Sequence, residues 1–388
     1  MTPGARVAAA IEVLDAIRAG SAAEQALTGW ARGARYAGSK DRAAVRDHVF
    51  HVLRRWRSCA ALGGGEAGRA LMLGALRDRG EDPARLFTGE GYAPAPLVPD
   101  EMSRGRPATE AEARDLPDWL WPHFDRSLGA DAGRVAGALR DRAPVMLRVN
   151  LRRLSRDEAR ARLAAEGIVT EPVETAKAAL HVLEGERKVA QSESYGTGLV
   201  ELQDASSQAA MERLNLPVGA RVLDYCAGGG GKVLALAARA EAAWFAHDIA
   251  PQRIAALPPR AARAGAEVTV LATEALGLAA PFDLVLCDMP CSGSGTWRRS
   301  PEAKWRLTPA RLLELTRLQS DILVRAAALV APGGCLVYTT CSVLDIENQD
   351  VTGDFTADFP SWQMTDRCHW PVCDSGDGFY FAQIKREL

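Results

Sequence analysis

The sequence predicts a mixed α/β protein in which a helical N-terminal segment precedes a small α/β segment and a doubly wound parallel sheet. Apolar residues recur at helical spacing in the first 130 residues, and short runs rich in β-formers begin near residue 145. From Asp204 onward, strand and helix patterns alternate, which is typical of a sheet covered by helices on both faces. We therefore expect a helical domain over 1–130, a small α/β domain over 140–203 and a doubly wound domain over 204–388.

The totals describe an ordinary globular chain. Its 388 residues are too many for one compact core, so division into domains is expected. Hydrophobic residues make up 47% of the chain and charged residues 25%. The formal net charge of -2 excludes binding of polyanions by bulk charge, so any nucleic-acid contact must come from local basic patches.

Nothing at the N-terminus resembles a signal peptide or a membrane anchor, because Glu12 and Asp15 interrupt its apolar pattern. A cytoplasmic protein without a membrane partner is expected. The eight cysteines form no CxxC pair and have no accompanying histidines at zinc-site spacing. We expect free thiols and no metal site.

The helical segment is predicted from two apolar repeats, one from Val7 to Ile17 and one from Val45 to Trp56. Ser39 is the expected N-cap of the second helix, with Asp41 in its first turn.

The small α/β segment is expected to begin with a strand over Val145–Val149. A capping box formed by Ser155 and Glu158 should open the following helix. Short strands are expected around 168–172, 179–183 and 198–202. Arg148 belongs to a basic edge that also includes Arg152, Arg153 and Arg156. The charge pattern alone leaves both a solvated arginine face and RNA contact open.

The doubly wound sheet is predicted from six apolar runs separated by helical patterns. These are Val222–Asp224, Trp244–Asp248, Val268–Leu271, Phe282–Asp288, Cys335–Thr340 and Phe379–Ile384. The ends of such strands are where open α/β sheets bind ligands.

A glycine-rich loop after the first of these strands, DYCAGGGGK at 224–232, indicates a cofactor site. Four successive glycines allow a tight turn and a close approach to a ligand. Asp248 follows at the offset expected of a ribose acceptor. A P-loop would need glycine instead of Cys226 and a hydroxyl residue instead of Val233, and Val233 also breaks the dinucleotide register. S-adenosylmethionine fits better, since it needs a ribose acceptor, a place for adenine and backbone donors.

Two cysteines are predicted at the carboxyl ends of neighbouring strands, in DMPCSGSG and TTCSVLDIEN. Cys291 and Cys341 therefore lie beside Asp288 and the glycine loop. Methylation of a pyrimidine at carbon 5 explains such a pair: one thiolate adds to carbon 6, and a second group removes the carbon 5 proton. Asp288 can hydrogen-bond the ring and stabilise the addition.

Beyond Cys291, cations alternate with aromatic residues, a composition suited to phosphates and stacked bases. The predicted RNA contacts are Trp297, Arg298, Arg299 and Lys304. A buried tryptophan beneath solvated arginines is the competing interpretation.

These motifs, with LRVN at 147–150, ELQDASSQ at 201–208 and the terminal DGFYFAQIKR, resemble the Sun/Fmu-type (RsmB-like) RNA cytosine-5 methyltransferases. SKDRAAVRDHVFHVLRRW similarly resembles the NusB-like helical domain of some RNA-modifying enzymes. The resemblance implies a Rossmann-type methyltransferase domain, S-adenosylmethionine, Cys341 as nucleophile and Cys291 as the residue that assists product release.

The family's cofactor residues carry over to a set that includes the whole glycine loop: Cys226, Ala227, Gly228, Gly229, Gly230, Gly231, Lys232, Asp248 and Asp288. Two departures stand out. Gly228 and Gly229 replace the usual Ala-Pro. Thr273, with Glu274 adjacent, stands where the family usually has an aspartate that meets the adenine amine.

The expected function is methylation of carbon 5 of a cytosine in RNA, with the target base unpaired or flipped out of its stack. The expected partner is ribosomal RNA, with transfer RNA as the other possibility, and the protein is expected to be a monomer. A non-catalytic RNA-binding assembly factor with a decayed cofactor site is the alternative. A DNA cytosine methyltransferase would use the Pro-Cys thiol as nucleophile. The RNA-type front segment argues against this class of enzyme.

Overall fold

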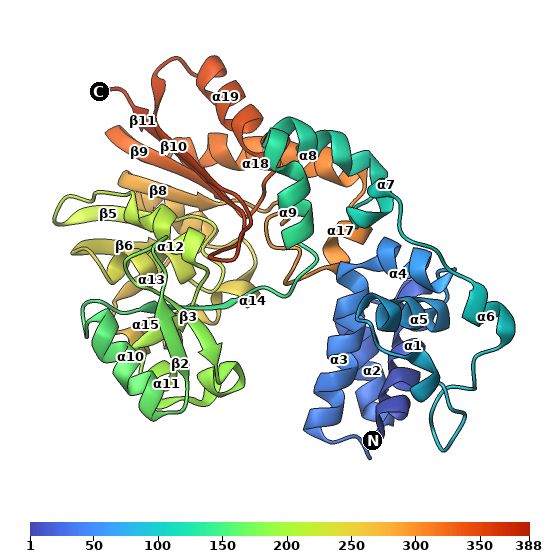
Figure 1. Cartoon of the computed structure of the whole chain (residues 1–388). Helices are drawn as coiled ribbons and strands as arrows, with labels where there is room; N and C mark the ends of the chain where they lie inside the picture. Colours follow the sequence, from blue (N-terminus) through green and yellow to red (C-terminus); the bar gives the residue numbers. More distant parts are fainter. The chain divides into compact units, whose positions relative to one another are not determined.

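The computed structural model describes residues 1–388, and the chain divides into two compact units (Figure 1). The helical unit comprises Met1–Asp125, Gly129–Arg142 and Trp297–Leu307, and the sheet unit comprises Arg126–Leu128, Ala143–Thr296 and Thr308–Leu388. The predicted α/β class is confirmed. The small and large sheets lie in one unit, however, and residues 297–307 belong with the N-terminal helices. The boundaries of the three predicted domains stay a prediction.

The helical unit is built from short helices. They are α1 (Pro3–Arg18), α2 (Ala23–Gly33), α3 (Ser39–Arg54), α4 (Trp56–Gly63), α5 (Gly68–Asp78), α6 (Pro99–Ser103), α7 (Glu110–Ala113), α8 (Trp121–Leu128, whose last turn clusters with the sheet unit), α9 (Ala132–Ala138) and α17 (Glu302–Arg306). The apolar positions of α1, α3 and α5 form its core, which includes Leu14, Val49 and Leu71. Burial of these side chains is the main stabilising contribution.

Two local features differ from the sequence prediction. The N-cap of α3 is Gly38, whose N–H donates to the Asp41 carboxylate at 3.2 Å, so the predicted Ser39 cap is wrong by one residue. Trp56 does not continue α3 but begins α4 after a break at Arg55. Helices α4 and α5 approach so closely that a Cβ on Gly74 would lie 1.9 Å from the Cys59 carbonyl oxygen. Glycine is therefore required there.

The small sheet has the strand order β2-β3-β1-β4, and all its pairs are antiparallel. Its strands are β1 (Val145–Val149), β2 (Val169–Pro172), β3 (Ala179–Glu184) and β4 (Val200–Leu202). Helices α10 (Arg156–Ala165) and α11 (Glu193–Gly196) accompany them. The Ser155–Glu158 capping box is present, as predicted.

The large sheet has the order β10-β11-β9-β8-β5-β6-β7. Its strands are β5 (Ala220–Asp224), β6 (Ala242–Ala246), β7 (Val268–Val270), β8 (Phe282–Asp288), β9 (Val330–Thr340), β10 (Trp362–Trp370) and β11 (Phe379–Arg386). Strands β5 to β9 are parallel, whereas β11 and β10 add an antiparallel edge. The neighbouring pair β8 and β9 places Asp288 opposite Thr339. The loops that carry Cys291 and Cys341 therefore leave the same edge.

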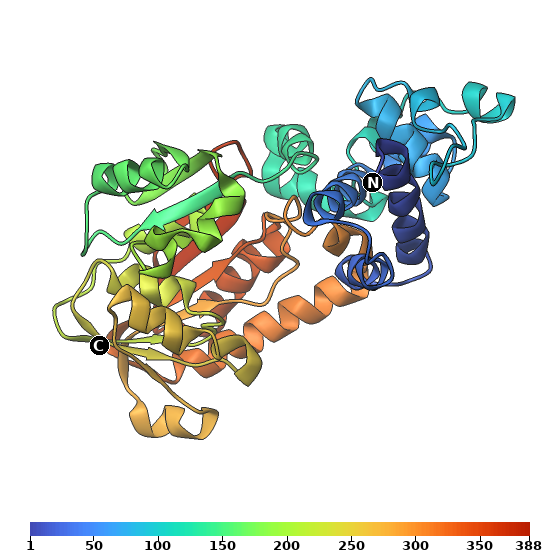
Figure 2. The same ribbon diagram turned by 90° about the horizontal axis from the view of Figure 1, so that it is seen from below.

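Helices cover both faces of this sheet. On one face pack α12 (Ala205–Glu212), α13 (Gly231–Ala237) and α15 (Leu257–Ala264). On the other pack α16 (Leu276–Ala279), α18 (Pro309–Ala327) and α19 (Gln349–Asp358), and α14 (Pro251–Ile254) completes the unit. Figure 2 shows α18, in orange, running alongside β8 and β9, with which it makes its sheet contacts.

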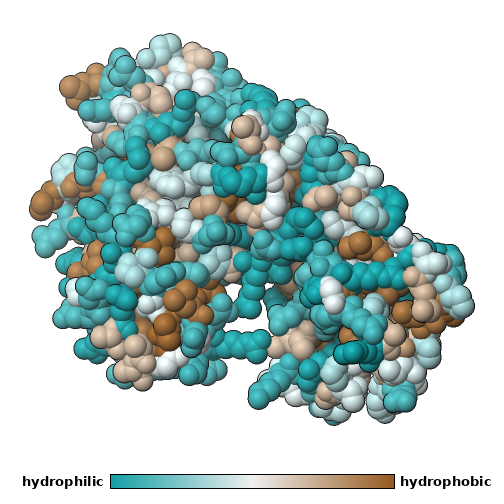
Figure 3. All heavy atoms as spheres, viewed as in Figure 1, coloured by the Kyte–Doolittle hydropathy of each residue, from teal (hydrophilic) through white to brown (hydrophobic).

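The molecular surface shown in Figure 3 is mostly hydrophilic, with hydrophobic residues in small separate patches. None of the helices combines the length and the apolar character that crossing a membrane requires.

Candidate active site

The glycine loop between β5 and α13 is held in a backbone conformation that suits glycine. Gly228 and Gly230 have φ values of +49° and +79°. A Cβ on Gly230 would lie 2.2 Å from Leu257 Cδ1, so the loop also packs tightly against α15. The loop backbone is therefore closely packed at Gly230, next to the Gly228–Gly229 pair that replaces the usual Ala-Pro.

Asp248 lies two residues beyond β6 and is bound to the glycine loop. Its Oδ2 accepts from the Gly228 N–H at 2.9 Å, and its Oδ1 accepts from the Ala250 N–H at 2.9 Å. The Arg253 guanidinium lies 3.7 Å from Oδ2. A carboxylate oxygen has lone pairs for more than one donor, so this geometry leaves capacity for the hydroxyls of a ribose.

Asp224, at the end of β5, is a buried carboxyl group with one unused oxygen. Oδ2 accepts from the Val233 N–H at 3.2 Å, whereas Oδ1 is buried and has no hydrogen-bond partner. Burial raises the pKa of Asp224 to about 7. An unsatisfied acceptor beside a glycine loop fits a ligand that carries an amino group, such as S-adenosylmethionine. In the sequence, Asp224 is recognisable only as the start of the loop.

The two predicted cysteines lie side by side. Their Sγ atoms are 3.5 Å apart, and Thr296 Oγ1 donates to Cys341 Sγ at 3.9 Å. The hydrogen bond from Cys291 is the main cause that lowers the pKa of Cys341. Lys232 and Thr296 lower it further, and together these effects outweigh burial and the negative charge of Asp288, which raise it. The same hydrogen bond, together with burial, raises the pKa of Cys291 well above its ordinary value. Of the two thiols, Cys341 is therefore the one that loses its proton more readily.

Asp288 meets Lys232 at this edge of the sheet. Lys232 Nζ lies 2.5 Å from Asp288 Oδ2, and Thr339 Oγ1 donates to Oδ1 at 3.3 Å. The ammonium of Lys232 also lies 5.1 Å from the centre of the Phe379 ring. Lys232 thus joins the glycine loop to the carboxylate beside the thiols, rather than lying with the loop alone.

A buried carboxylate joins the loops of the two cysteines, a role that the sequence pattern did not predict. Glu347 accepts from the Ser292 N–H at 2.7 Å and from Ser342 Oγ at 2.6 Å. Gln319 Nε2 donates to it at 3.2 Å. A second link runs from Ser294 Oγ to Ser342 Oγ at 2.8 Å. The only sequence signal is an acid between the TTC turn and the next helix, which is common in helix starts.

The other residues predicted to contact the cofactor lie in different environments. Burial raises the pKa of the Cys226 thiol to about 12, so its sulfur is not activated. The Gly229 carbonyl accepts from Arg260 at 2.5 Å. Thr273 Oγ1 lies 3.0 Å from His247 Nε2, and Glu274 is exposed nearby. The choice between Thr273 and Glu274 as the adenine contact stays open.

Four of the predicted RNA contacts are buried, which corrects that expectation. Trp297, Arg298 and Lys304 are 1%, 2% and 1% exposed, and Arg148 is 5% exposed. A side chain without accessible surface cannot contact a polymer. The competing interpretation, a buried tryptophan beneath solvated arginines, is right for Trp297 but wrong for Arg298, and of this group Arg299 alone is exposed. Its role in RNA contact stays a prediction.

Arg148 instead supports the glycine loop from the small sheet. Its Nη1 donates to the Gly231 carbonyl oxygen at 2.7 Å and to Gln203. Burial lowers the pKa of Arg148 to about 10, which leaves it a cation at neutral pH. Lys304 is internal as well, and its Nζ donates to the Arg54 carbonyl oxygen at 2.8 Å. Burial lowers the pKa of Lys304 to about 7.

A glycine loop with two carboxylates and a paired thiol at one edge of a doubly wound sheet defines a methyltransferase-type site. Residues 211–385 match the model of the 16S rRNA methyltransferase RsmB/F family, and residues 116–190 match its RsmF/B-like ferredoxin-like domain. The chain belongs to the RsmB/F methyltransferase family. Its membership agrees with S-adenosylmethionine as the predicted cofactor.

Three comparisons give the extent of the likeness. The chain is 32% identical over 308 residues to ribosomal RNA small subunit methyltransferase B of Sodalis glossinidius, which covers 74% of this chain and 71% of that protein. It is 33% identical over 300 residues to the protein of the same name from Klebsiella pneumoniae, covering 71% and 67%. The crystal structure of PH0851 has a TM-score of 0.77 at 22% identity, covering 100% of this chain and 99% of that one, and shows the shared fold.

Proposed function

We propose that the protein methylates carbon 5 of a cytosine in RNA, and that the RNA is ribosomal, as the names of its relatives suggest. The observation that carries the proposal is the pair of thiols 3.5 Å apart, with the lowered pKa on Cys341. A reaction that needs one thiolate and a second proton-accepting group beside it uses both members of such a pair. A cytoplasmic location remains the expectation.

The cofactor is S-adenosylmethionine, and when bound it supplies an electrophilic methyl group. Asp248 would accept hydrogen bonds from its ribose, and Asp224 Oδ1 would accept from its amino group. The backbone of Gly228–Gly231 would approach its methionine part. Lys232 and Arg148 hold this loop in place through Asp288 and the Gly231 carbonyl.

The residues of the chain divide the work on cytosine. Cys341 Sγ adds to carbon 6, and the electron pair of the 5,6 double bond moves to carbon 5, which then carries the new methyl group. Asp288 accepts a hydrogen bond from the exocyclic amine and holds the ring. Loss of the carbon 5 proton restores the double bond and breaks the bond between sulfur and carbon 6, which releases Cys341 as a thiolate.

Cys291 is the group that accepts the carbon 5 proton. Before reaction its pKa is raised by its hydrogen bond to Cys341 and by burial. Once Cys341 is bonded to carbon 6, it no longer carries a negative charge or accepts that hydrogen bond. The pKa of Cys291 then falls, its proton leaves to solvent, and the resulting thiolate is a base beside carbon 5. In this scheme, Cys341 carries the negative charge before addition to carbon 6, and Cys291 carries it afterwards.

Exchange of each cysteine tests these roles. Cys341→Ala is expected to abolish methylation, because no thiolate adds to carbon 6. Cys291→Ala is expected to retain addition and lose release, so a protein–RNA adduct should survive a denaturing gel. Cys368→Ala, in the edge strand β10, is the matched control and should leave methylation unchanged.

Detection of the adduct with Cys341→Ala, and not with Cys291→Ala, would invert the assignment. Mapping of 5-methylcytosine in ribosomal RNA from cells with and without the protein identifies the target. The alternative of a non-catalytic assembly factor requires no cofactor, so calorimetric titration with S-adenosylmethionine separates the two functions: we expect binding.

A further inference from the structure

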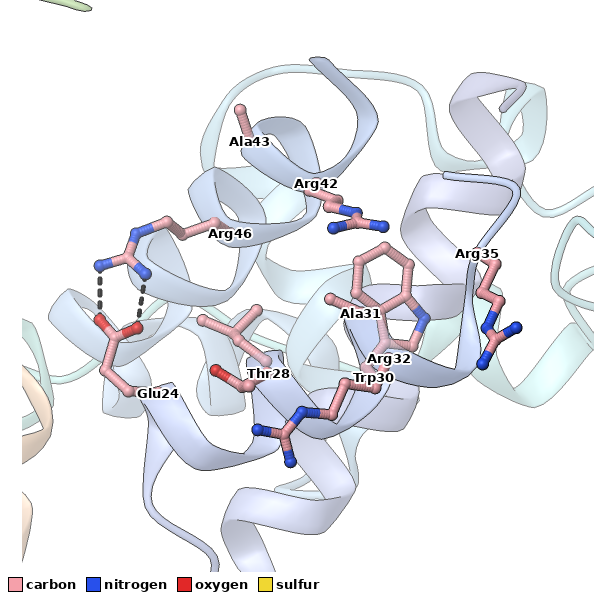
Figure 4. A pocket seen from close by; sticks show the side chains of 10 residues that line it. Glu24, Thr28, Trp30, Ala31, Arg32, Arg35, Arg42, Ala43 and Arg46 are labelled. Atoms are coloured by element: carbon pink, nitrogen blue, oxygen red, sulfur yellow. Dashed lines mark hydrogen bonds and ion pairs between the residues drawn. The ribbon is translucent and has the colours of Figure 1, made fainter. Parts of the chain in front are cut away.

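The helical unit contains a cavity of about 770 Å³ that is lined by arginines. Figure 4 shows the Trp30 indole among the side chains of Arg32, Arg35 and Arg42. These come from α2, from the connection after it and from α3. Three cations thus converge around one aromatic ring in a hollow of the surface.

The three arginines have free charge. Arg46, at the rim, is paired with Glu24 through two hydrogen bonds of 2.6 and 2.5 Å. By contrast, Arg32 and Arg35 form no ion pair, and Arg42 donates only to the Ala37 carbonyl oxygen at 3.0 Å. Guanidinium groups that lack carboxylate partners and lie in a hollow are suited to anionic ligands, phosphates in particular.

Aromatic rings continue the surface beyond Trp30. Trp30 also lines a second cavity, of about 500 Å³, together with Tyr36 and Tyr92. The two tyrosines are stacked with ring centres 6.3 Å apart, yet they are 70% and 82% exposed. Large rings at that exposure contribute little to the core and offer flat faces to a ligand.

We propose that this arginine–tyrosine surface (Trp30, Arg32, Arg35, Tyr36, Arg42 and Tyr92) binds a single-stranded segment of the RNA substrate. The arginines hold the phosphates, and the rings stack on unpaired bases. The identification of the ligand as the RNA substrate rests on the proposed function. The surface itself is formed by residues of the helical unit alone. It replaces the buried residues 297, 298 and 304 as the basic aromatic element of the chain.

The chemistry favours a nucleic acid over an acidic protein segment. An acidic peptide would use the arginines but has no need of three aromatic rings. The second cavity also contains Glu12 and Glu90, whose carboxylates can accept hydrogen bonds from the N–H groups of bases. A duplex is disfavoured because its bases are stacked on one another and their faces are covered.

The test uses the full chain and a labelled oligouridylate in a fluorescence anisotropy titration at several salt concentrations. Each phosphate contact contributes about 0.7 to the slope of log affinity against log salt for a single strand. The double variant Arg32→Gln/Arg35→Gln should reduce that slope by about 1.4. Arg18→Gln/Arg85→Gln, which removes two exposed charges elsewhere in the same unit, should leave it unchanged.

A second variant separates stacking from charge. Tyr36→Ala/Tyr92→Ala should weaken binding about tenfold with the salt slope unchanged, since stacking releases no counterions. An unchanged slope in Arg32→Gln/Arg35→Gln overturns the inference. So does equal binding of polyglutamate with the same sensitivity to the arginine changes, which would assign the surface to an acidic protein.

Measurement of methyl transfer to RNA with the same variants distinguishes a failure of the proposed RNA surface from a failure of the proposed reaction. We expect the KM for RNA to rise in Arg32→Gln/Arg35→Gln and kcat to stay the same. Normal methylation with an unchanged salt slope refutes only the RNA surface. A reduced salt slope in a protein that never methylates cytosine refutes only the proposed reaction.

Discussion

Asp224 shows how a single carboxyl group can couple cofactor binding to pH. Burial raises its pKa from 3.8 to about 7, so in the folded protein it holds its proton over a range in which the unfolded chain has lost it. The folded state then binds more protons than the unfolded state. The free energy of unfolding therefore falls as pH rises from about 4 to about 7, and stays low above that.

Replacement of this carboxyl tests the coupling. Asp224→Asn should be more stable than the original protein at about pH 8, by about 1 to 4 kcal/mol, and nearly equal to it below about pH 4. It should also bind S-adenosylmethionine more weakly, because the neutral amide attracts an ammonium group less. Urea unfolding at several pH values and calorimetry measure the two effects. Asp321→Asn, on the exposed side of α18, is the control.

A stability difference that is the same at low and high pH would contradict the assignment, because it would point to altered packing rather than to titration. Asp224→Asn is expected to raise the free energy of unfolding and to lower the affinity for S-adenosylmethionine. This combination is expected only if the buried carboxyl serves ligand binding rather than stability.

At the scale of elements, the short 3-10 turn Asp345–Glu347 links the two loops that carry the thiols. Glu347 is buried and accepts hydrogen bonds from one residue of each loop, Ser292 and Ser342. The separation of the two sulfurs thus depends on a side chain whose hydrogen bonds go to the neighbouring serines, and whose charge also raises the pKa of Cys291. Glu347 is a positioning residue.

Glu347→Gln should lower kcat about 10- to 100-fold with little change in the KM for RNA, since misplacement by about 1 Å has effects of that size. The pKa of Cys341, read from the pH dependence of its alkylation, should rise as the hydrogen bond from Cys291 loosens. Glu314→Gln, an exposed pair partner of Arg311, is the control. An unchanged alkylation profile with reduced activity would assign Glu347 a purely structural role.

Strong periodicity made most elements predictable from sequence. Strands such as Phe282–Asp288 contain an apolar run, here Leu284–Cys287, that is followed by turn residues, and the structure places them where the pattern does. Strand β10 escaped prediction because Gln363, Asp366 and Arg367 interrupt its apolar pattern, as an edge strand allows. The adjacency of Cys291 and Cys341 followed from two strand ends, whereas the Glu347 link depends on tertiary packing that no local pattern encodes.

Burial was the hardest property to predict. A basic aromatic stretch has the same composition whether it faces solvent or, as here, packs inside a helical unit. Trp297 stacks at 6.0 Å from Phe124, and Trp305 donates to the Leu53 carbonyl oxygen at 2.7 Å. These partners lie far away in sequence, so only the fold identifies them.

At the scale of the whole molecule, the chain leaves the helical unit and later returns to it through Trp297–Leu307. This segment supplies the hydrogen bond from Lys304 to the Arg54 carbonyl oxygen, and Glu302 accepts from the Ala23 N–H at 2.9 Å. The helical unit is therefore not complete at residue 142, although the sequence pattern of a helical domain ends before it.

A fragment of residues 1–142 should melt about 10 °C below the same fragment supplied with a peptide of residues 297–307, because the buried rings and carbonyl partners are missing. Calorimetric melting with and without the peptide measures the difference. A peptide with Trp297, Lys304 and Trp305 changed to Ala is the control and should not raise the melting temperature. Equal melting with both peptides would show that the segment is dispensable.

The return of the chain also sets an order of events on the ribosome. At about 5–20 residues per second, the segment that completes the helical unit follows Arg142 by roughly 10 to 30 s. During that interval the nascent helices lack the contacts that Phe124 and Leu53 later make with Trp297 and Trp305. Any chain whose translation stops before Trp297 lacks these contacts and leaves the helical unit incomplete.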